Sequence, residues 1–189
     1  MNNIALDKKL MFKALKEAKR GIPYVYPNPA VGCVIYDGSK ILSTGYHKKF
    51  GEIHAEHEAI KNLDEMVKGL TMYVSLEPCT HTGKTGACLD LIDPEVFERV
   101  VIADKDPNSE ASGSIEKLKK RGIKVDLGLL KHEARKLNKR FYVFHEKKRP
   151  YVILKYASTL DGFIAQENGY SKWITNEKSR KENHYTRSI

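Results

Sequence analysis

The chain has 189 residues, 41% of them hydrophobic, and a formal net charge of +9. This length provides for one domain of ordinary size plus an appendage too small for a large core of its own. No run of about 18 apolar residues occurs, and residues 1–9 contain no apolar secretory core, which excludes a membrane span and predicts a cytoplasmic protein. In that reducing compartment, three Cys residues favour a metal site over a disulfide framework.

The positive charge is concentrated in one segment. Residues 1–130 carry 19 Lys or Arg against 18 Asp or Glu, whereas residues 131–150 carry 8 against 2. A protein that binds along a phosphate backbone usually presents a basic face beside its site. Because the larger part of the chain is nearly neutral, the sequence predicts no nucleic-acid partner. The basic segment fits an amphipathic connecting helix with a charged outer face.

Hydrophobic periodicity predicts alternating helices and strands. Residues 7–20 place apolar side chains on one helical stripe, and Asp37 with Gly38 joins strands at 30–36 and 41–47 as a hairpin. The remaining elements expected are a helix from His54 to about Met66, a strand at 71–76, a short helix after Cys88, a strand at 99–103, a helix at 114–121, a strand at 124–127 and a helix from Lys131 to about His145. This order predicts a three-layer α/β/α sandwich with a mixed sheet.

Four residues combine the donors of a zinc site with a nearby acid: His54, Glu56, Cys79 and Cys88. One imidazole and two thiolates fill three positions of a tetrahedral zinc site and leave the fourth for water, whose pKa the metal lowers. Glu56 is placed to move a proton from that water to a leaving amine. Either pair alone fits polar residues on a helix face or buried thiols equally well. Together they indicate a hydrolytic zinc deaminase.

The segment from Ser75 to Cys88, with eight residues between Cys79 and Cys88, resembles the riboflavin-biosynthesis pyrimidine deaminase. That enzyme is usually the N-terminal half of a bifunctional deaminase/reductase, whereas cytidine and deoxycytidylate deaminases typically have two residues between the paired cysteines. Residues 27–32, 45–47 and 106–108 also resemble the family. The resemblance implies a cytidine deaminase-like fold in a domain at 1–149. It also implies one Zn²⁺ per chain held by His54, Cys79 and Cys88, with Glu56 as the proton shuttle.

The same resemblance implies a substrate and the residues that bind it. The reaction would be hydrolytic removal of the 2-amino group from 2,5-diamino-6-ribosylamino-4(3H)-pyrimidinone 5′-phosphate, with release of ammonia. The residues expected to bind this small phosphorylated pyrimidine are Asn28, His47, Lys84, Asp106 and Asn108, with His81 of the loop between the cysteines as a further candidate. Ordinary turns, a strand end and a solvated lysine would explain the same residues without a ligand.

Residues 150–189 resemble the opening of the family's NADPH-dependent reductase domain, through segments 151–165 and 171–174. Only 39 residues follow Pro150, whereas a dinucleotide-binding domain needs several βαβ units of roughly 30 residues each. We therefore expect a truncated fragment that binds no NADPH and has no reductase activity by itself. Its apolar stretch at 152–160 is expected to form a strand that pairs with another element or chain. A separate reductase subunit and a homo-oligomer both remain open.

Two other functions remain open at this point. A deaminase of another base, such as a cytosine nucleotide, guanine or adenosine in tRNA, would use the same metal and acid; the nearly neutral main part and the eight-residue spacer argue against it. A non-catalytic subunit would keep zinc for stability and take part in assembly; an intact Glu56 beside a full set of ligands argues against that. The sequence therefore predicts a zinc-dependent hydrolase with no nucleic-acid or membrane partner.

Overall fold

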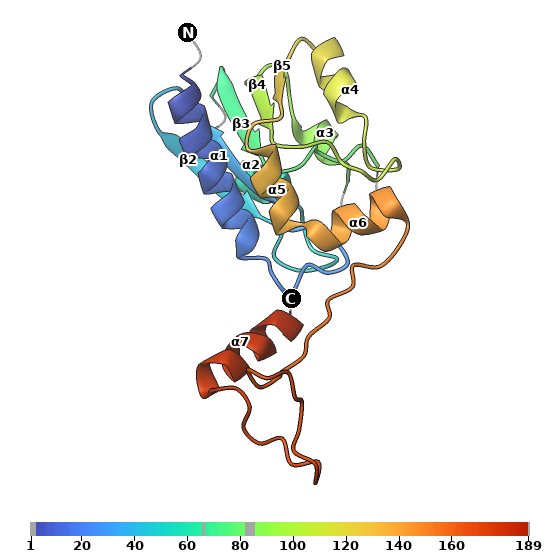
Figure 1. Cartoon of the computed structure of the whole chain (residues 1–189). Helices are drawn as coiled ribbons and strands as arrows, with labels where there is room; N and C mark the ends of the chain where they lie inside the picture. Colours follow the sequence, from blue (N-terminus) through green and yellow to red (C-terminus); the bar gives the residue numbers. More distant parts are fainter. Residues whose placement is uncertain (1–2, 66, 82–85, 189) are drawn as a thin grey trace. The chain divides into compact units, whose positions relative to one another are not determined.

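The computed structural model describes residues 3–65, 67–81 and 86–188, and its chain divides into two compact units, residues 1–150 and 151–189 (Figure 1). The first unit contains, in chain order, α1 (Ile4–Lys19), β1 (Gly32–Tyr36), β2 (Ile41–Tyr46), α2 (Ala55–Lys61), β3 (Leu70–Val74), α3 (Cys88–Leu91), β4 (Phe97–Ile102), α4 (Ser114–Lys120), β5 (Lys124–Leu127), α5 (Lys131–Leu137) and α6 (Lys139–Lys147). The second unit contains α7 (Glu177–Ser188). None of the helices in these described ranges is long and apolar enough to cross a membrane.

The sheet is mixed, with the strand order β2-β1-β3-β4-β5. Strand β1 pairs antiparallel with β2 and with β3, whereas β3, β4 and β5 are parallel. The hairpin between β1 and β2 forms where Asp37 and Gly38 predict it, with Gly38 at a positive φ of 98°. The parallel strands need crossover connections, and α3 and α4 supply them.

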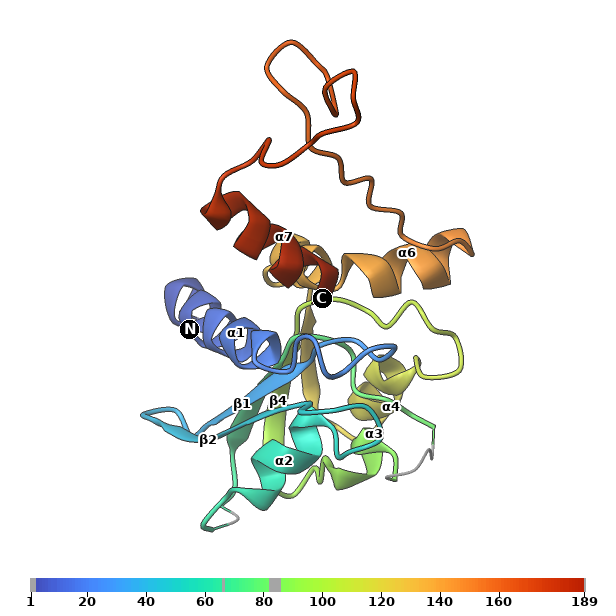
Figure 2. The same cartoon turned by 90° about the horizontal axis from the view of Figure 1, so that it is seen from below.

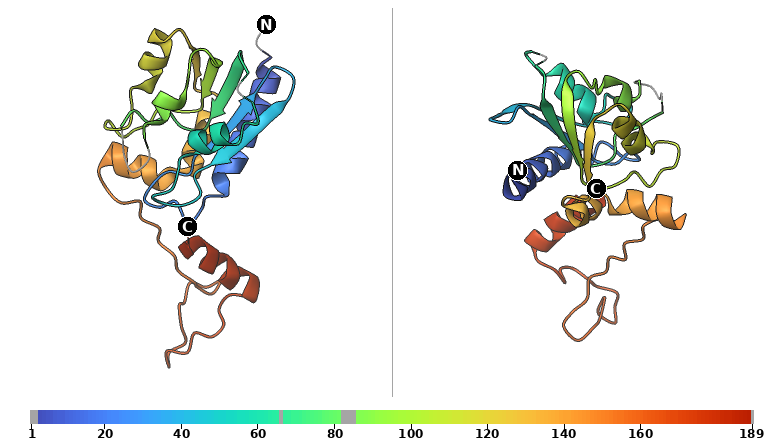
Figure 3. Two further views of the ribbon diagram at one scale, coloured as in Figure 1. Left: turned by 180° about the vertical axis from the view of Figure 1, so that it is seen from behind. Right: turned by 90° about the horizontal axis from the view of Figure 1, so that it is seen from above.

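Helices cover both faces of the sheet. Ile35, Met72 and Val100 point to one face, where they are buried in a core that includes Ala55 and Ala59 of α2. The neighbouring residues along each strand point to the other face and pack with Leu10, Met11 and Ala14 of α1 and with Ala134 of α5. Figures 2 and 3 show α1 on one side of the sheet and α2, α3 and α4 on the other. The predicted three-layer α/β/α sandwich is therefore confirmed.

Two predicted helices are corrected by the structure. The helix expected from His54 to about Met66 ends at Lys61, because Asn62 leaves the helix and its side-chain amide donates to the carbonyl oxygen of Thr44 at 3.3 Å. Met66 lies outside the described residues. The single helix expected from Lys131 to about His145 is two helices that run in different directions (Figure 1). The break falls at Asn138, whose side chain binds the backbone of Ala30.

The strand expected at 152–160 is a third correction. Residues 151–159 form neither a helix nor a strand. A strand is stable only when its backbone groups pair with a neighbouring strand, and the described part of the second unit offers no such neighbour. An apolar pattern in sequence therefore did not suffice to make a strand in this segment.

Helix α2 lies unusually close to strand β2, and Gly45 is the residue that allows this approach. A Cβ atom at Gly45 would overlap the backbone of Ala55 and Ala59. Gly32 of β1 has the same relation to Ala14 and Ala18 of α1. Since both helices meet the sheet at a glycine, the distance of each helix from the sheet is set by backbone contact.

We expect Gly45→Ala to lower the free energy of unfolding by at least about 2 kcal/mol, because the added methyl group must push α2 away from β2. Urea denaturation of the two proteins measures this difference. Gly86→Ala is the control, since a Cβ at Gly86 meets no atom within 4 Å. Equal midpoints for Gly45→Ala and Gly86→Ala would show that the contact with α2 is not close.

A partly buried ion network joins α1 to the parallel strands. Arg99 of β4 donates two hydrogen bonds to the Asp7 carboxylate, at 2.9 and 2.8 Å, and one to Asp126 of β5 at 2.6 Å. Tyr73 of β3 donates to Asp7 at 2.5 Å. The hydrogen bonds from Arg99 lower the pKa of Asp7 below its usual 3.8, against the opposing effect of burial. The ionised pair of Asp7 and Arg99 therefore holds α1 against the sheet.

Replacing Asp7 by Asn should cost about 2–3 kcal/mol at pH 7, because Arg99 loses a charged partner. The folded pKa of Asp7 lies below the unfolded value, so its stabilisation is present above about pH 4 and is lost as the pH falls further. Urea midpoints from pH 7 to pH 3 should therefore converge for wild type and Asp7→Asn. The exposed Asp64→Asn serves as the control, and a constant gap across this range would contradict the ion pair.

Candidate metal centre and substrate pocket

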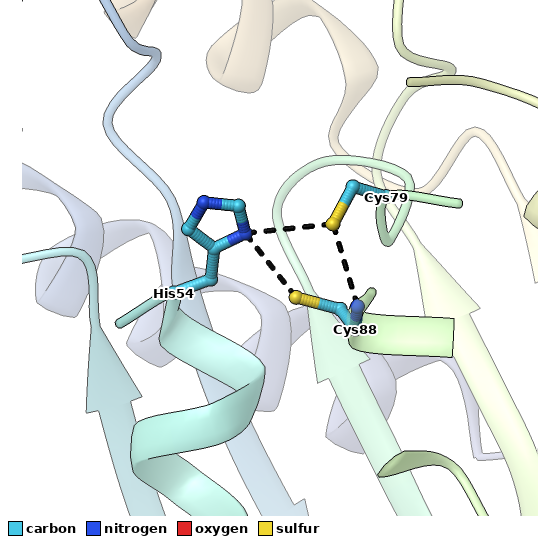
Figure 4. A group of neighbouring side chains, drawn as sticks. All are labelled: His54, Cys79 and Cys88. Carbon is cyan, nitrogen blue, oxygen red and sulfur yellow. Dashed lines mark hydrogen bonds between the residues drawn. The ribbon is translucent and has the colours of Figure 1, made fainter. Parts of the chain in front are cut away.

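Three segments that are distant in sequence bring His54, Cys79 and Cys88 together (Figure 4). His54 is the residue that precedes α2, Cys79 follows β3 after Pro78, and Cys88 is the first residue of α3. Cys79 and Cys88 are buried, and His54 is half-buried. The ends of one strand and two helices thus meet at one edge of the sheet.

The distances between these side chains fit a tetrahedral metal. His54 Nδ1 lies 3.3 Å from Cys88 Sγ and 3.5 Å from Cys79 Sγ, and all three atoms lie within 4.8 Å of one another. With zinc bonds of about 2.05 Å to nitrogen and about 2.3 Å to sulfur, tetrahedral angles place nitrogen and sulfur about 3.6 Å apart. One nitrogen and two sulfur donors are a preferred zinc ligand set. His54, Cys79 and Cys88 therefore fit Zn²⁺ in both geometry and chemistry.

The two thiols differ in acidity. A hydrogen bond from Cys88 lowers the pKa of the Cys79 thiol below its usual range, and His54 and the Cys88 backbone N–H, 3.4 Å away, support the same anion. That shared hydrogen bond and burial raise the pKa of Cys88. A thiolate at Cys79 is therefore favoured by the fold, and a divalent cation among the three side chains would displace the remaining proton.

Glu56 lies in the first turn of α2, two residues after His54, and only 3% of it is exposed. Burial raises the pKa of its carboxyl group, while the nearby His54 opposes the shift. A raised pKa makes the carboxylate a stronger proton acceptor, which favours its use as a general base. The side chain borders the same cavity as His54 and Cys79.

One cavity collects most of the residues predicted to bind substrate. Its lining includes His54, Glu56 and Cys79 together with Asn28, His47, His81, Asp106 and Asn108. Lys84, the remaining predicted residue, lies outside the described residues. The cavity thus joins two of the predicted metal ligands to five of the predicted substrate contacts, whose individual roles stay predictions.

His47 and Asn28 form a fixed pair on one wall. His47 is 2% exposed, and its Nδ1 lies 3.1 Å from the carbonyl oxygen of Ile53. Because a carbonyl oxygen only accepts, Nδ1 carries the proton and Nε2 accepts from the Asn28 side-chain amide at 3.2 Å. Burial lowers the pKa of His47, which keeps the ring neutral. His47 therefore holds the Asn28 amide in one orientation at the cavity.

The loop between β4 and α4 forms another part of the cavity wall, and Glu77 holds it. The Glu77 carboxylate is 4% exposed and accepts from the backbone N–H groups of Asp106 at 3.2 Å and Gly113 at 2.8 Å. It also accepts from Ser114 and Ile115 at the start of α4. Asp106 itself has a pKa raised to about 6, by burial and then by the Glu77 charge. Glu77 thereby connects the loop of Asp106 and Asn108 to the segment of Cys79.

Sequence reasoning missed three residues around this cavity: Glu77, Asn138 and Phe141. Glu77 lies within the segment from Ser75 to Cys88 but was assigned no role of its own. Phe141 lines the cavity from α6, and the basic segment that contains it was assigned to a connecting helix. An Asn at the middle of that helix was the available signal, since Asn is unfavourable in helix interiors and frequent where a helix ends.

Comparison with known proteins defines the class. The family model for the zinc-binding region of cytidine and deoxycytidylate deaminases matches residues 4–104. A model for the RibD C-terminal domain matches residues 150–189. The fold and the ligand cluster thus define a zinc-binding deaminase of the cytidine deaminase class.

Individual relatives narrow the family within this class. The diaminohydroxyphosphoribosylamino-pyrimidine deaminase of Buchnera aphidicola subsp. Schizaphis graminum is 44% identical over 137 residues, 72% of this chain and 93% of that protein. The riboflavin biosynthesis protein RibD of Aquifex aeolicus is 48% identical over 183 residues, 96% of this chain and 51% of that protein. The crystal structure of a diaminohydroxyphosphoribosylaminopyrimidine deaminase/5-amino-6-(5-phosphoribosylamino)uracil reductase from Thermotoga maritima has a TM-score of 0.93 at 43% identity and covers 98% of this chain and 54% of that chain.

The chain therefore belongs to the diaminohydroxyphosphoribosylaminopyrimidine deaminase family, as the segment from Ser75 to Cys88 predicted. It spans about half the length of the RibD relatives that it matches over nearly its whole length.

Removal of one ligand tests the metal centre. Zinc per chain, measured by plasma mass spectrometry after dialysis, should be about one for wild type and near zero for Cys79→Ala, because two remaining ligands do not hold the ion. Cys33→Ala is the matched control, since Cys33 is buried in strand β1 outside the ligand cluster. Equal zinc in Cys79→Ala and Cys33→Ala would exclude Cys79 as a ligand.

Proposed function

We propose that the chain catalyses the hydrolytic deamination of 2,5-diamino-6-ribosylamino-4(3H)-pyrimidinone 5′-phosphate in riboflavin biosynthesis. The observation that carries this proposal is the cavity in which Glu56 and two of the predicted zinc ligands, His54 and Cys79, meet Asn28, His47, Asp106 and Asn108. The cavity thus combines a hydrolytic centre with polar groups suited to a heterocycle. The name of the Buchnera relative, at 93% coverage of that protein, supports the same substrate.

Zn²⁺ bound at His54, Cys79 and Cys88 would supply a Lewis acid that lowers the pKa of a water molecule at the open position. The Glu56 carboxylate accepts one proton of the attacking water and passes it to ring nitrogen N1, and the second water proton is carried in the same way to the 2-amino nitrogen, which leaves as ammonia. The water oxygen ends as the new carbonyl oxygen of the ring. Because Glu56 is buried, the proton passes between enzyme and substrate without exchange through bulk solvent.

The remaining polar residues orient the substrate in this proposal. The Asn28 amide, held by His47, and the Asp106 and Asn108 side chains offer donors and acceptors to the edges of the pyrimidinone and to the ribose. His81 is exposed at the cavity and, with Lys84, is proposed to contact the phosphate. A cation that meets a phosphate oxygen strengthens the hydrogen bond by its charge.

Residues 150–189 are proposed to be the opening segment of a reductase domain, in agreement with the family model that matches them. NADPH binding and reduction would need further residues, in the same chain or in a separate subunit, because a dinucleotide site requires several βαβ units. The domain division at 149/150, a homo-oligomer and a cytoplasmic location stay predictions.

Loss of the proton shuttle tests the reaction. With the zinc-loaded protein, Glu56→Gln should reduce kcat for ammonia release from the pyrimidinone ribosyl phosphate by about 10²- to 10⁴-fold, because the amide cannot accept the proton. Glu58→Gln is the matched control. Glu58 is also a buried glutamate of α2, but it accepts from the Tyr46 backbone N–H and pairs with Lys48, outside the cavity.

The same assay separates the alternatives. Release from cytidine, guanine or a tRNA adenosine stem-loop in preference to the pyrimidinone would identify a deaminase of another base. Equal behaviour of wild type and Glu56→Gln with every substrate would indicate a non-catalytic, zinc-stabilised subunit.

A further inference from the structure

Helix α6 contributes one side chain to the cavity, and this contribution has no role in the chemistry described so far. Phe141 is half-buried and lines the cavity together with His54, Glu56 and Asp106. Among the described residues of that lining, it has the largest apolar side chain. Phe144, one helical turn further along α6, is 59% exposed and lies outside the cavity lining.

Asn138 fixes the start of α6 to the segment of the cavity wall that follows Asn28. Its side chain accepts from the Ala30 N–H at 2.8 Å and donates to the Ala30 carbonyl oxygen at 2.9 Å. Asn138 is 7% exposed, and the neighbours of Ala30 on both sides, Pro29 and Val31, line the cavity. Two hydrogen bonds in a buried environment therefore determine where the first turn of α6, with Phe141, stands relative to this wall.

Asp104 fixes the corner between α5 and α6 from the α5 side. It is 3% exposed and pairs with Lys131 at 3.1 Å and with Arg135 at 2.9 Å, both on α5. The Arg135 guanidinium lies over the ring of Tyr142, the residue after Phe141, at 4.1 Å from its centroid. Asp104 also leads directly into the loop of Asp106. The first turn of α6, which carries Phe141, is thus tied through Asn138 to Ala30 and through Arg135 to Asp104, so Phe141 is a preorganised residue of the cavity.

We infer that Phe141 supplies the aromatic face on which the pyrimidinone ring of the substrate stacks. Asn28, Asp106 and Asn108 line the cavity with polar side chains. Hydrogen bonds from such groups to a heterocycle would lie in the plane of the ring, which leaves its faces to apolar contact. Aromatic side chains satisfy such faces for any flat base. This inference rests on the proposed function, and it makes Phe141 a residue that distinguishes ring-bearing ligands from plain sugar phosphates.

Equilibrium binding to a protein that does not turn over tests this role. In the zinc-loaded Glu56→Gln background, we compare Phe141→Leu with Phe144→Leu by calorimetric titration of the pyrimidinone ribosyl phosphate and, separately, of ribose 5-phosphate. Phe141→Leu keeps an apolar side chain but removes the aromatic face, so the Kd of the pyrimidinone should rise about three- to tenfold. The Kd of ribose 5-phosphate should change less than about twofold, and Phe144→Leu should leave both values unchanged. Phe144→Leu is matched because both phenylalanine rings contact His145.

Each outcome bears on the inference. An unchanged Kd of the pyrimidinone in Phe141→Leu would overturn it, and so would a parallel rise for ribose 5-phosphate, which would indicate a general distortion of the cavity. Phe141→Met replaces Phe141→Leu if the latter fails to fold, as judged by circular dichroism. If the parent protein does not bind the pyrimidinone at all, the proposed function itself fails, and the inference with it.

Discussion

The backbone contact between α2 and β2 at Gly45 is the constraint on which the site depends. His54 and Glu56 lie at the first turn of α2. The distance of that helix from the sheet therefore decides where both side chains lie relative to Cys79 and Cys88. Cys79 follows strand β3 and Cys88 begins helix α3, so these two ligands come from other elements than α2. A metal site of this kind tolerates errors of only a few tenths of an ångström in its ligands. A side chain at position 45 would therefore disturb the geometry of the ligands as well as the packing.

A second constraint joins the metal side of the cavity to the substrate side. Glu77 is a buried carboxylate whose oxygens accept four hydrogen bonds from the loop of Asp106 and from the start of α4. Thr80 adds a backbone hydrogen bond to Ala111 at 2.9 Å. Glu77 and Thr80 flank the segment of Cys79, so the residues proposed to bind the ring are placed by the same segment that supplies a metal ligand. Positioning of this kind reduces the reorganisation required when substrate binds.

Much of the fold and of the metal centre followed from local patterns in the sequence. The β1–β2 hairpin appears where Asp37 and Gly38 stand, and the apolar runs at β3 and β4 form neighbouring parallel strands. His54, Cys79 and Cys88 were recognisable because few chemistries need one imidazole and two thiolates together. The α5–α6 corner was not recognisable in this way. The amphipathic pattern of residues 131–147 continues through Asn138, and the competing hydrogen bonds to Ala30 join residues 108 positions apart.

The sequence by itself determined the alternation of helices and strands and the family, and it predicted the zinc ligands and the proton shuttle, because each depends on residue type and on spacing along the chain. Only the tertiary structure decided which further side chains share the cavity. Phe141 reaches it because α6 turns at Asn138, and Glu77 acts on a loop about 30 residues further along the chain. Such contacts depend on how the strands assemble into the sheet and on how closely each helix packs against it. Both are properties of the whole packed core.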